Sequence, residues 1–110
     1  MSDDQYIDDV HDIFEEDLKL DSRHKLKEPK MYRVIMLNDH YTTMDFVVEV
    51  LMKVFKKGIA DATKIMLDIH RRGKGICGIY TYDIAITKTA QVHKLARERE
   101  FPLKCSYEEA

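Results

Sequence analysis

Apolar residues recur with two different periods along residues 29–110, and these periods predict three strands and three helices. Continuous or alternating apolar runs, typical of buried or half-buried strands, cover about residues 31–37, 76–81 and 103–108. Apolar residues at helical spacing cover about residues 43–57, 59–72 and 83–100. The order β-α-α-β-α-β predicts an α+β fold, in which three helices pack on a small three-stranded antiparallel sheet.

Glycine and proline separate these predicted elements. Gly58 is expected to end the first helix and Gly73 to end the second, because glycine is common just after a helix. Gly78 lies inside the second strand, where it predicts a bulge or a close approach of another group. Pro102 separates the last helix from the last strand, and Pro29 marks the start of the folded body.

Polar residues fill the turn between the first strand and the first helix. Asn38, Asp39 and His40 follow the apolar strand directly. Thr42 is expected to cap the helix, since Asp45 follows three residues later, as in a capping box. The pattern therefore places an amide and a carboxylate beside an apolar floor.

His70, at the end of the second helix, is the other candidate for chemistry. It lies one turn after Met66 and beside Ile69 on the helix surface. If the second helix packs beside the start of the first, Asn38 and Asp39 converge with His70 over a pocket. The residues expected to line it, mostly hydrophobic, are Met36, Thr42, Met44, Val47, Met66, Ile69 and Leu103.

The charge is divided unequally along the 110 residues. The net charge is −2, yet residues 1–28 hold ten Asp and Glu against four Lys and Arg, and the remainder carries a net +4. The first 28 residues have apolar positions at near-helical spacing, but the segment is too short and too charged to hold a helix alone. We therefore divide the chain into an acidic N-terminal extension, residues 1–28, and a folded domain, residues 29–110.

Several classes of function find little support in the composition. The body lacks a dense basic stripe interleaved with aromatic residues, so we expect no nucleic-acid partner. The longest apolar run is too short for a membrane span, and the first residues lack a signal-peptide pattern, so a cytoplasmic location is expected. The histidines never pair at the spacing of metal ligands, and we expect neither metal nor cofactor.

An enzyme and a general interaction domain are the alternatives. Cys77, His70 and Asn38 have the residue types of a thiol hydrolase, but Cys77 lies within an apolar strand, where a thiol is expected to be buried and inert. A groove for internal hydrophobic segments is a further interpretation. A histidine at a helix C-terminus and an Asn-Asp pair before a helix also have purely structural uses.

The segment LNDHYTTMDFV, residues 37–47, resembles the signature of the ClpS family, bacterial and plastid adaptors that bring N-degron substrates to an AAA+ protease. Further similarity, at residues 62–70, 73–78, 87–88, 96–98 and 102–105, extends the resemblance over about residues 29–110. It implies recognition without catalysis. Asn38, Asp39 and His70 would bind the free α-amino group of a substrate whose first side chain, Phe, Tyr, Trp or Leu, enters the hydrophobic pocket.

The resemblance also assigns roles around the pocket and identifies two departures. Met44 matches the family's gatekeeper methionine, which disfavours Ile and Val. His40 stands where the family usually has a second acid, so weaker attraction for an ammonium group is expected. Thr43 stands where proline is usual, and this difference in the first turn of the helix is expected to have almost no effect.

The partners that the resemblance implies are a ClpA- or ClpC-type unfoldase and its ClpP peptidase. Tyr41, Asp83 and Lys88 match the region that contacts the unfoldase in the family. The acidic extension would be engaged during substrate handover. We expect the adaptor itself to be a monomer.

Overall fold

The computed structural model describes residues 28–110, so the predicted acidic extension lies outside the described residues except for Glu28. The elements, in chain order, are β1 (Met31–Leu37), α2 (Met44–Lys53), α3 (Ile59–Arg72), β2 (Lys74–Thr81), α4 (Tyr82–Glu98) and β3 (Lys104–Glu109). This order confirms the predicted α+β fold.

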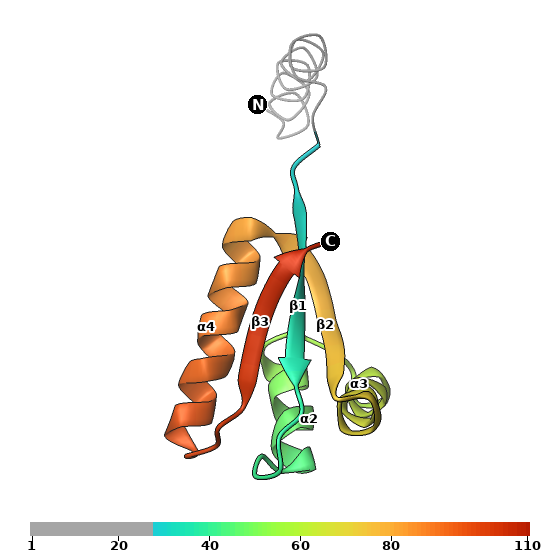
Figure 1. Ribbon diagram of the computed structural model, residues 1–110, viewed down its shortest axis with the longest axis vertical. Coiled ribbons are helices and arrows are strands. Elements are labelled where there is room, and N and C mark those ends of the chain that lie inside the picture. Colours follow the sequence, from blue (N-terminus) through green and yellow to red (C-terminus); the bar gives the residue numbers. More distant parts are fainter. Residues whose placement is uncertain (1–27) are drawn as a thin grey trace, which may run out of the picture.

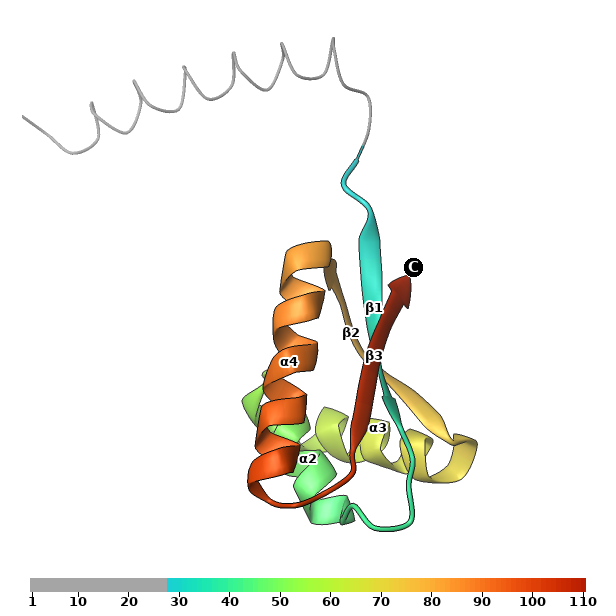
Figure 2. The same ribbon diagram turned by 60° about the vertical axis from the view of Figure 1, so that its left-hand side comes forward.

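The sheet has β1 at its centre, in the order β2-β1-β3, and both pairings are antiparallel. Figure 1 shows α4 beside β3, α3 beside β2, and α2 between the two helices. In the turned view of Figure 2, α4 and α2 lie on one side of β1 and β3. Val34 and Met36 of β1 have no exposed surface, as the period-two alternation of a strand that packs on helices requires.

The N-cap of the first helix lies one residue later than predicted. The N-cap of α2 is Thr43, whose hydroxyl accepts a hydrogen bond from the Phe46 backbone N–H at 3.2 Å. Thr42 does not cap the helix, because its hydroxyl and its backbone N–H both donate to Asp39. Thr43 is therefore not a silent first-turn residue but the cap itself.

The predicted end of the first helix is also wrong. α2 ends at Lys53, and Gly58 caps the start of α3 instead of ending α2. The chain leaves the helix early with Lys56 at a φ of 56°. Val54 and Phe55 remain buried, with 6% and 4% of their surfaces exposed, and both belong to the hydrophobic core.

The remaining boundaries agree with the prediction more closely. α3 spans the predicted residues, and Gly73 ends it with a φ of 88°, the left-handed conformation that favours glycine. The β1–β2 register shifts between Val34 and Ile35, which confirms an irregularity beside Gly78. A Cβ at Gly78 would collide with the ring of Tyr80, so the close approach that the glycine predicted is also present.

Candidate functional site

The turn between β1 and α2 is organised by the carboxylate of Asp39. One of its oxygens accepts hydrogen bonds from the backbone N–H groups of Tyr41 and Thr42, at 2.8 and 2.6 Å. The other accepts a bond from the Thr42 hydroxyl at 2.7 Å. An aspartate that binds the backbone two and three residues ahead stabilises a tight turn. The shape of this turn therefore depends on Asp39.

The same hydrogen bonds keep Asp39 charged. Burial alone would raise the pKa of its carboxyl, but the bonds from Thr42 and Tyr41, together with the nearby His40, bring that pKa below its usual value. Asp39 is consequently ionised at neutral pH. A carboxylate has about four lone-pair positions, and three are used here, so it can accept one more hydrogen bond.

A backbone contact joins this turn to the end of α3. The Asn38 N–H donates to the Gly73 carbonyl at 2.9 Å, and the Gly73 N–H donates to the carbonyl of Ile69 at 2.9 Å. Asn38 is thereby held beside the last turn of α3, which carries His70. This contact explains why two segments about 30 residues apart contribute to the same place.

The two segments enclose a cavity of about 260 Å³. Its lining consists of Asn38, Asp39, His40, Thr42, Met44, Val47, Met66, Ile69 and His70. The structure therefore brings together all three residues predicted to bind an amino group and five of the seven predicted around the hydrophobic part. The lining also includes His40, the third polar residue of the turn that follows β1.

Two of the predicted pocket residues lie elsewhere. Met36 is completely buried and Leu103 is 4% exposed, and neither lines the cavity. Both belong to the hydrophobic core that also contains Val47 and Ile69. Met36 faces this core because β1 alternates its side chains between the two faces of the sheet.

The cavity has an apolar interior and a polar rim. Val47 and Ile69 are 6% and 3% exposed and form its inner wall, whereas Asn38 and His70 are exposed. Met44 is 44% exposed at the beginning of α2. Such an arrangement suits a ligand with a hydrophobic group at one end and a hydrogen-bond donor next to it.

The three residues expected to contact an unfoldase do not form one surface. Tyr41 is 78% exposed and follows the end of β1. Asp83 is exposed in the first turn of α4, beside the beginning of β1, because Met31 pairs with Thr81. Lys88 is only partly exposed, and its Nζ donates to the carbonyl of Val54 at 2.7 Å. Lys88 therefore has a structural contact of its own.

The alternative of a thiol hydrolase finds no cysteine at this cavity. Cys77 is fully buried, and burial raises the pKa of its thiol well above the usual value. Burial likewise raises the pKa of Cys105 to about 11. Neither cysteine lines the cavity. Thiols in such surroundings form little of the nucleophilic thiolate.

Within residues 28–110, no group of three or more His, Cys, Asp and Glu side chains is arranged to hold a metal ion. No helix of this part of the chain has the length and hydrophobicity to cross a membrane.

Comparison with known proteins gives consistent matches. The family model for "ATP-dependent Clp protease adaptor protein ClpS" matches residues 27–106. The ATP-dependent Clp protease adapter protein ClpS of Syntrophus aciditrophicus is 59% identical over 92% of this chain and 94% of its own length. The protein of the same name from Acetivibrio thermocellus is 64% identical over 78% of this chain and 87% of its own.

A solved structure matches as well. It is Agrobacterium tumefaciens ClpS2 bound to L-phenylalaninamide, which superposes with a TM-score of 0.73. That protein is 36% identical to this one, and the match covers 76% of this chain and 100% of the solved chain.

Proposed function

Because the chain belongs to the ClpS family of Clp protease adaptors, we propose that its cavity binds the first residue of substrate proteins that begin with Phe, Tyr, Trp or Leu. The adaptor then delivers these substrates to a ClpA- or ClpC-type unfoldase with ClpP and catalyses no reaction itself. One observation carries the proposal: Asn38, ionised Asp39 and His70 surround the entrance to a cavity whose inner wall is apolar.

The polar rim has the acceptors that a free α-amino group requires. An α-ammonium has a pKa of about 8 and three N–H donors. The amide oxygen of Asn38 and a neutral nitrogen of His70 supply two acceptors. Asp39 contributes its remaining lone pair and a full negative charge. An acetylated amine or an internal amide has neither the charge nor the donors to match this set.

The size of the cavity favours a single side chain. About 260 Å³ is below the usual range of roughly 300–1,000 Å³ for drug-sized ligands. Burying one Phe- or Leu-sized side chain contributes roughly 1.5–3 kcal/mol, and each hydrogen bond to a charged group adds a similar amount. Micromolar binding requires about 8 kcal/mol, so the side chain and the amino group are both needed.

The solved relative adds support from its ligand. L-phenylalaninamide, bound to ClpS2 of Agrobacterium tumefaciens, carries a free α-amino group and a phenyl side chain. These are the two features that the rim and the interior of the present cavity fit. We extend this mode of binding to the present chain because the two proteins share a fold and because of the pocket residues described above.

Met44 is proposed to select among hydrophobic first residues. Its position at the start of α2, partly exposed on the cavity lining, puts a thioether beside the Cβ of an entering side chain. An unbranched Cβ passes such a group, whereas the second branch of Val or Ile meets it. His40 on the same lining carries no fixed negative charge, so the attraction for the ammonium group depends on Asp39.

Asp83 and Lys88 of α4 are proposed as one contact with the unfoldase, and Tyr41, at the opposite end of β1, as a separate one. The acidic extension, residues 1–28, is proposed as a separate segment that the unfoldase engages during handover. The body, residues 29–110, then holds the substrate while the extension is engaged.

A fluorescence titration with peptides that differ only in their first residue tests the proposal. We expect peptides that begin with Phe or Leu to bind with micromolar affinity and a peptide that begins with Val to bind at least about tenfold more weakly. A peptide that begins with Asp should not bind measurably. Equal affinities for all four peptides would contradict recognition of the first side chain.

A further inference from the structure

A groove between α2 and α4 carries a concentration of positive charge, of which the proposed function uses only Lys88. It encloses about 530 Å³ and is lined by Lys53, Val54, Lys56, Lys88, Gln91, Lys94, Leu95 and Glu98. Four lysines and one glutamate thus border it. Val54 is buried and Leu95 is half-buried, so its floor is apolar. We call this region the lysine groove.

Two of these lysines have partners within the described part of the chain, and two have no ion pair there. Lys88 donates to the Val54 carbonyl at 2.7 Å, and Lys53 pairs with Glu49 at 3.6 Å. Lys56 and Lys94 are exposed and pair with no acidic side chain among residues 28–110. Apart from Glu98, the lining offers no acid to neutralise them.

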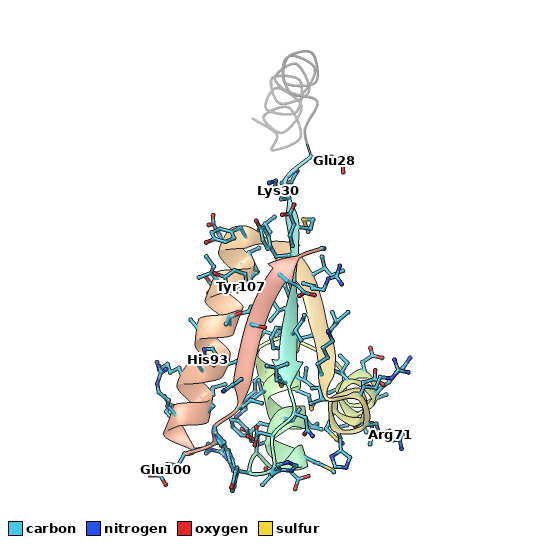
Figure 3. All side chains as sticks on the ribbon, in the orientation of Figure 1. Glu28, Lys30, Arg71, His93, Glu100 and Tyr107 are labelled. Atoms are coloured by element: carbon cyan, nitrogen blue, oxygen red, sulfur yellow. The ribbon has the colours of Figure 1, made fainter. Side chains whose placement is uncertain are left out.

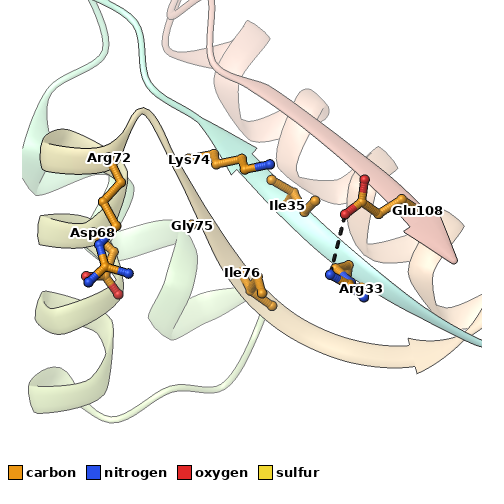
Figure 4. A pocket seen from close by; sticks show the side chains of 8 residues that line it. All are labelled: Arg33, Ile35, Asp68, Arg72, Lys74, Gly75, Ile76 and Glu108. Carbon is orange, nitrogen blue, oxygen red and sulfur yellow. Dashed lines mark ion pairs between the residues drawn. The ribbon is translucent and has the colours of Figure 1, made fainter. Parts of the chain in front are cut away.

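The open face of the sheet is the strongest rival for an acidic ligand. Its cavity, of about 320 Å³, is lined by Arg33, Ile35, Asp68, Arg72, Lys74, Gly75, Ile76 and Glu108. Figure 4 shows Arg33 beside Glu108, with 3.7 Å between their charged atoms. Three cations with two acids leave this face close to neutral. The charge therefore favours the lysine groove.

We propose that residues 1–27 of the same chain dock in the lysine groove. This segment contains nine Asp and Glu against four Lys and Arg. Its net charge of −5 is opposite in sign to the charge of the lysine groove. Four of its apolar residues, Ile7, Val10, Phe14 and Leu18, lie at near-helical spacing. They suit the apolar floor formed by Val54 and Leu95, while the surrounding acids meet Lys56 and Lys94.

Residues 1–27 can reach the lysine groove because the described chain begins beside the start of α4. Met31 pairs with Thr81, and the ring centres of Tyr32 and Tyr82 are 5.2 Å apart, so β1 begins beside the start of α4. In Figure 3, Glu28 and Lys30 lie at this end of the molecule, and Arg71 and Glu100 lie at the other.

The distances along α4 are short compared with the segment. The groove residues of α4 lie roughly 9–24 Å along the helix from Tyr82, at about 1.5 Å per residue. Twenty-seven residues reach about 90 Å when fully extended and about 40 Å as a helix. The segment can therefore span the groove in either conformation.

The contact is reversible and sensitive to salt. Pairs between exposed charges are weak and are screened once the Debye length falls below their separation. A tethered segment is nevertheless present at a high effective concentration, which favours docking within one chain over docking between chains. Docking would keep the extension on the body until a partner or salt releases it.

A nitroxide label on the full-length protein tests the proposal. The substitution Gln5→Cys changes no charge, and the native Cys77 and Cys105 are buried with raised pKa values, so the label attaches to the new cysteine. We expect the label to broaden the amide NMR signals of residues 53–56 and 88–98. The broadening should disappear in about 0.5 M NaCl.

Charge reversal supplies the matched control. Lys56→Glu with Lys94→Glu should abolish the broadening, whereas Lys64→Glu with Lys74→Glu makes the same change of charge at exposed lysines outside the groove and should leave it intact. The proposal would be overturned if the label broadened the signals of the open sheet face and this broadening disappeared in the variant with Lys64→Glu and Lys74→Glu. Weak broadening spread over the whole body would also overturn it.

A mixing experiment separates a second copy from the same chain. Spin-labelled protein without ¹⁵N is added to ¹⁵N-labelled protein without the nitroxide. Docking within one chain predicts no broadening in the mixture. Broadening of the groove signals in the mixture would mean that the occupant is a second copy, which contradicts the proposal.

Discussion

The two ends of α2 border different cavities and are held by different kinds of contact. At its beginning, Thr43 and Asp39 bind backbone groups two or three residues away, and the exposed rim of the candidate pocket begins there. At its end, Val54 and Phe55 are buried, and Lys88 binds the Val54 carbonyl from 34 positions farther along the chain. Local hydrogen bonds hold the beginning of α2. Buried side chains and a lysine that is distant in the sequence hold its end.

This difference separates binding from stability. Local hydrogen bonds at a surface turn can be exchanged or shared with a ligand at little cost to the fold. A half-buried lysine that satisfies a helix carbonyl cannot be removed without leaving that carbonyl without a partner. We therefore expect substitutions at the beginning of α2 to change peptide affinity and substitutions at its end to change the free energy of unfolding.

Asp39→Ala is expected to have the largest effect. It removes the negative charge from the pocket rim and all three bonds that shape the turn. Loss of one charged hydrogen bond costs roughly 1.5–3 kcal/mol. The affinity for a peptide that begins with Phe should therefore fall by about tenfold to 100-fold. Isothermal titration calorimetry measures the affinity.

A matched variant controls for general damage near the turn. Asp45→Ala removes an exposed acid at the start of the same helix that does not line the pocket. It should leave the affinity within about threefold of the original value, since an exposed charge near a helix end contributes only about 0.3–1 kcal/mol. Comparable losses from both variants would contradict the role assigned to Asp39.

Lys88→Met is the corresponding test of the other end. It removes the hydrogen bond to Val54 and the cation that lies 5.2 Å from the centre of the Tyr80 ring. The free energy of unfolding should fall by about 1–3 kcal/mol, because a partly buried carbonyl loses its partner. Urea denaturation measures this change, and peptide affinity should stay unchanged.

Lys94→Met is its control on the same helix, because Lys94 is exposed and has no ion pair among the described residues. Its effect on the free energy of unfolding should stay within about 0.5 kcal/mol. If Lys88→Met weakens peptide binding as strongly as Asp39→Ala, the two ends of α2 are not independent.

His40→Asp should give the smallest change and sharpen the picture of the binding end. It adds a negative charge to the pocket lining without altering a hydrogen bond that shapes the turn. Affinity for a free N-terminus should rise by about twofold to tenfold at low salt and by less at high salt. Unchanged or weaker binding in a titration at pH 7 would count against an electrostatic role for this position.

The fold was largely predictable because its signals are local. The apolar stripe of α3 and Gly73 after it indicated both ends of that helix. The end of α2 was not predictable, because the contact between Lys88 and Val54 joins residues 34 positions apart. Thr42 and Thr43 both fitted the pattern of a cap, and only the geometry shows that Asp39 already binds Thr42.

The candidate site shows the same limit. The residues next to the turn and along α3 were predicted to converge, and they line one cavity. Met36 and Leu103 were predicted to line the same cavity, yet both are buried in the core. The sequence also could not show the bond from Asn38 to the Gly73 carbonyl, because backbone hydrogen bonds leave no trace in residue identity.

Recognition of a free α-amino group by Asn38, Asp39 and His70 distinguishes this pocket from a general hydrophobic groove. Fluorescence anisotropy with one labelled peptide beginning with Phe, free or N-acetylated, tests it most directly. Acetylation removes the charge and two donors but keeps the side chain, so the affinity should fall at least about 100-fold. Equal affinity for the two peptides would contradict the claim and identify the cavity as a site for internal hydrophobic segments.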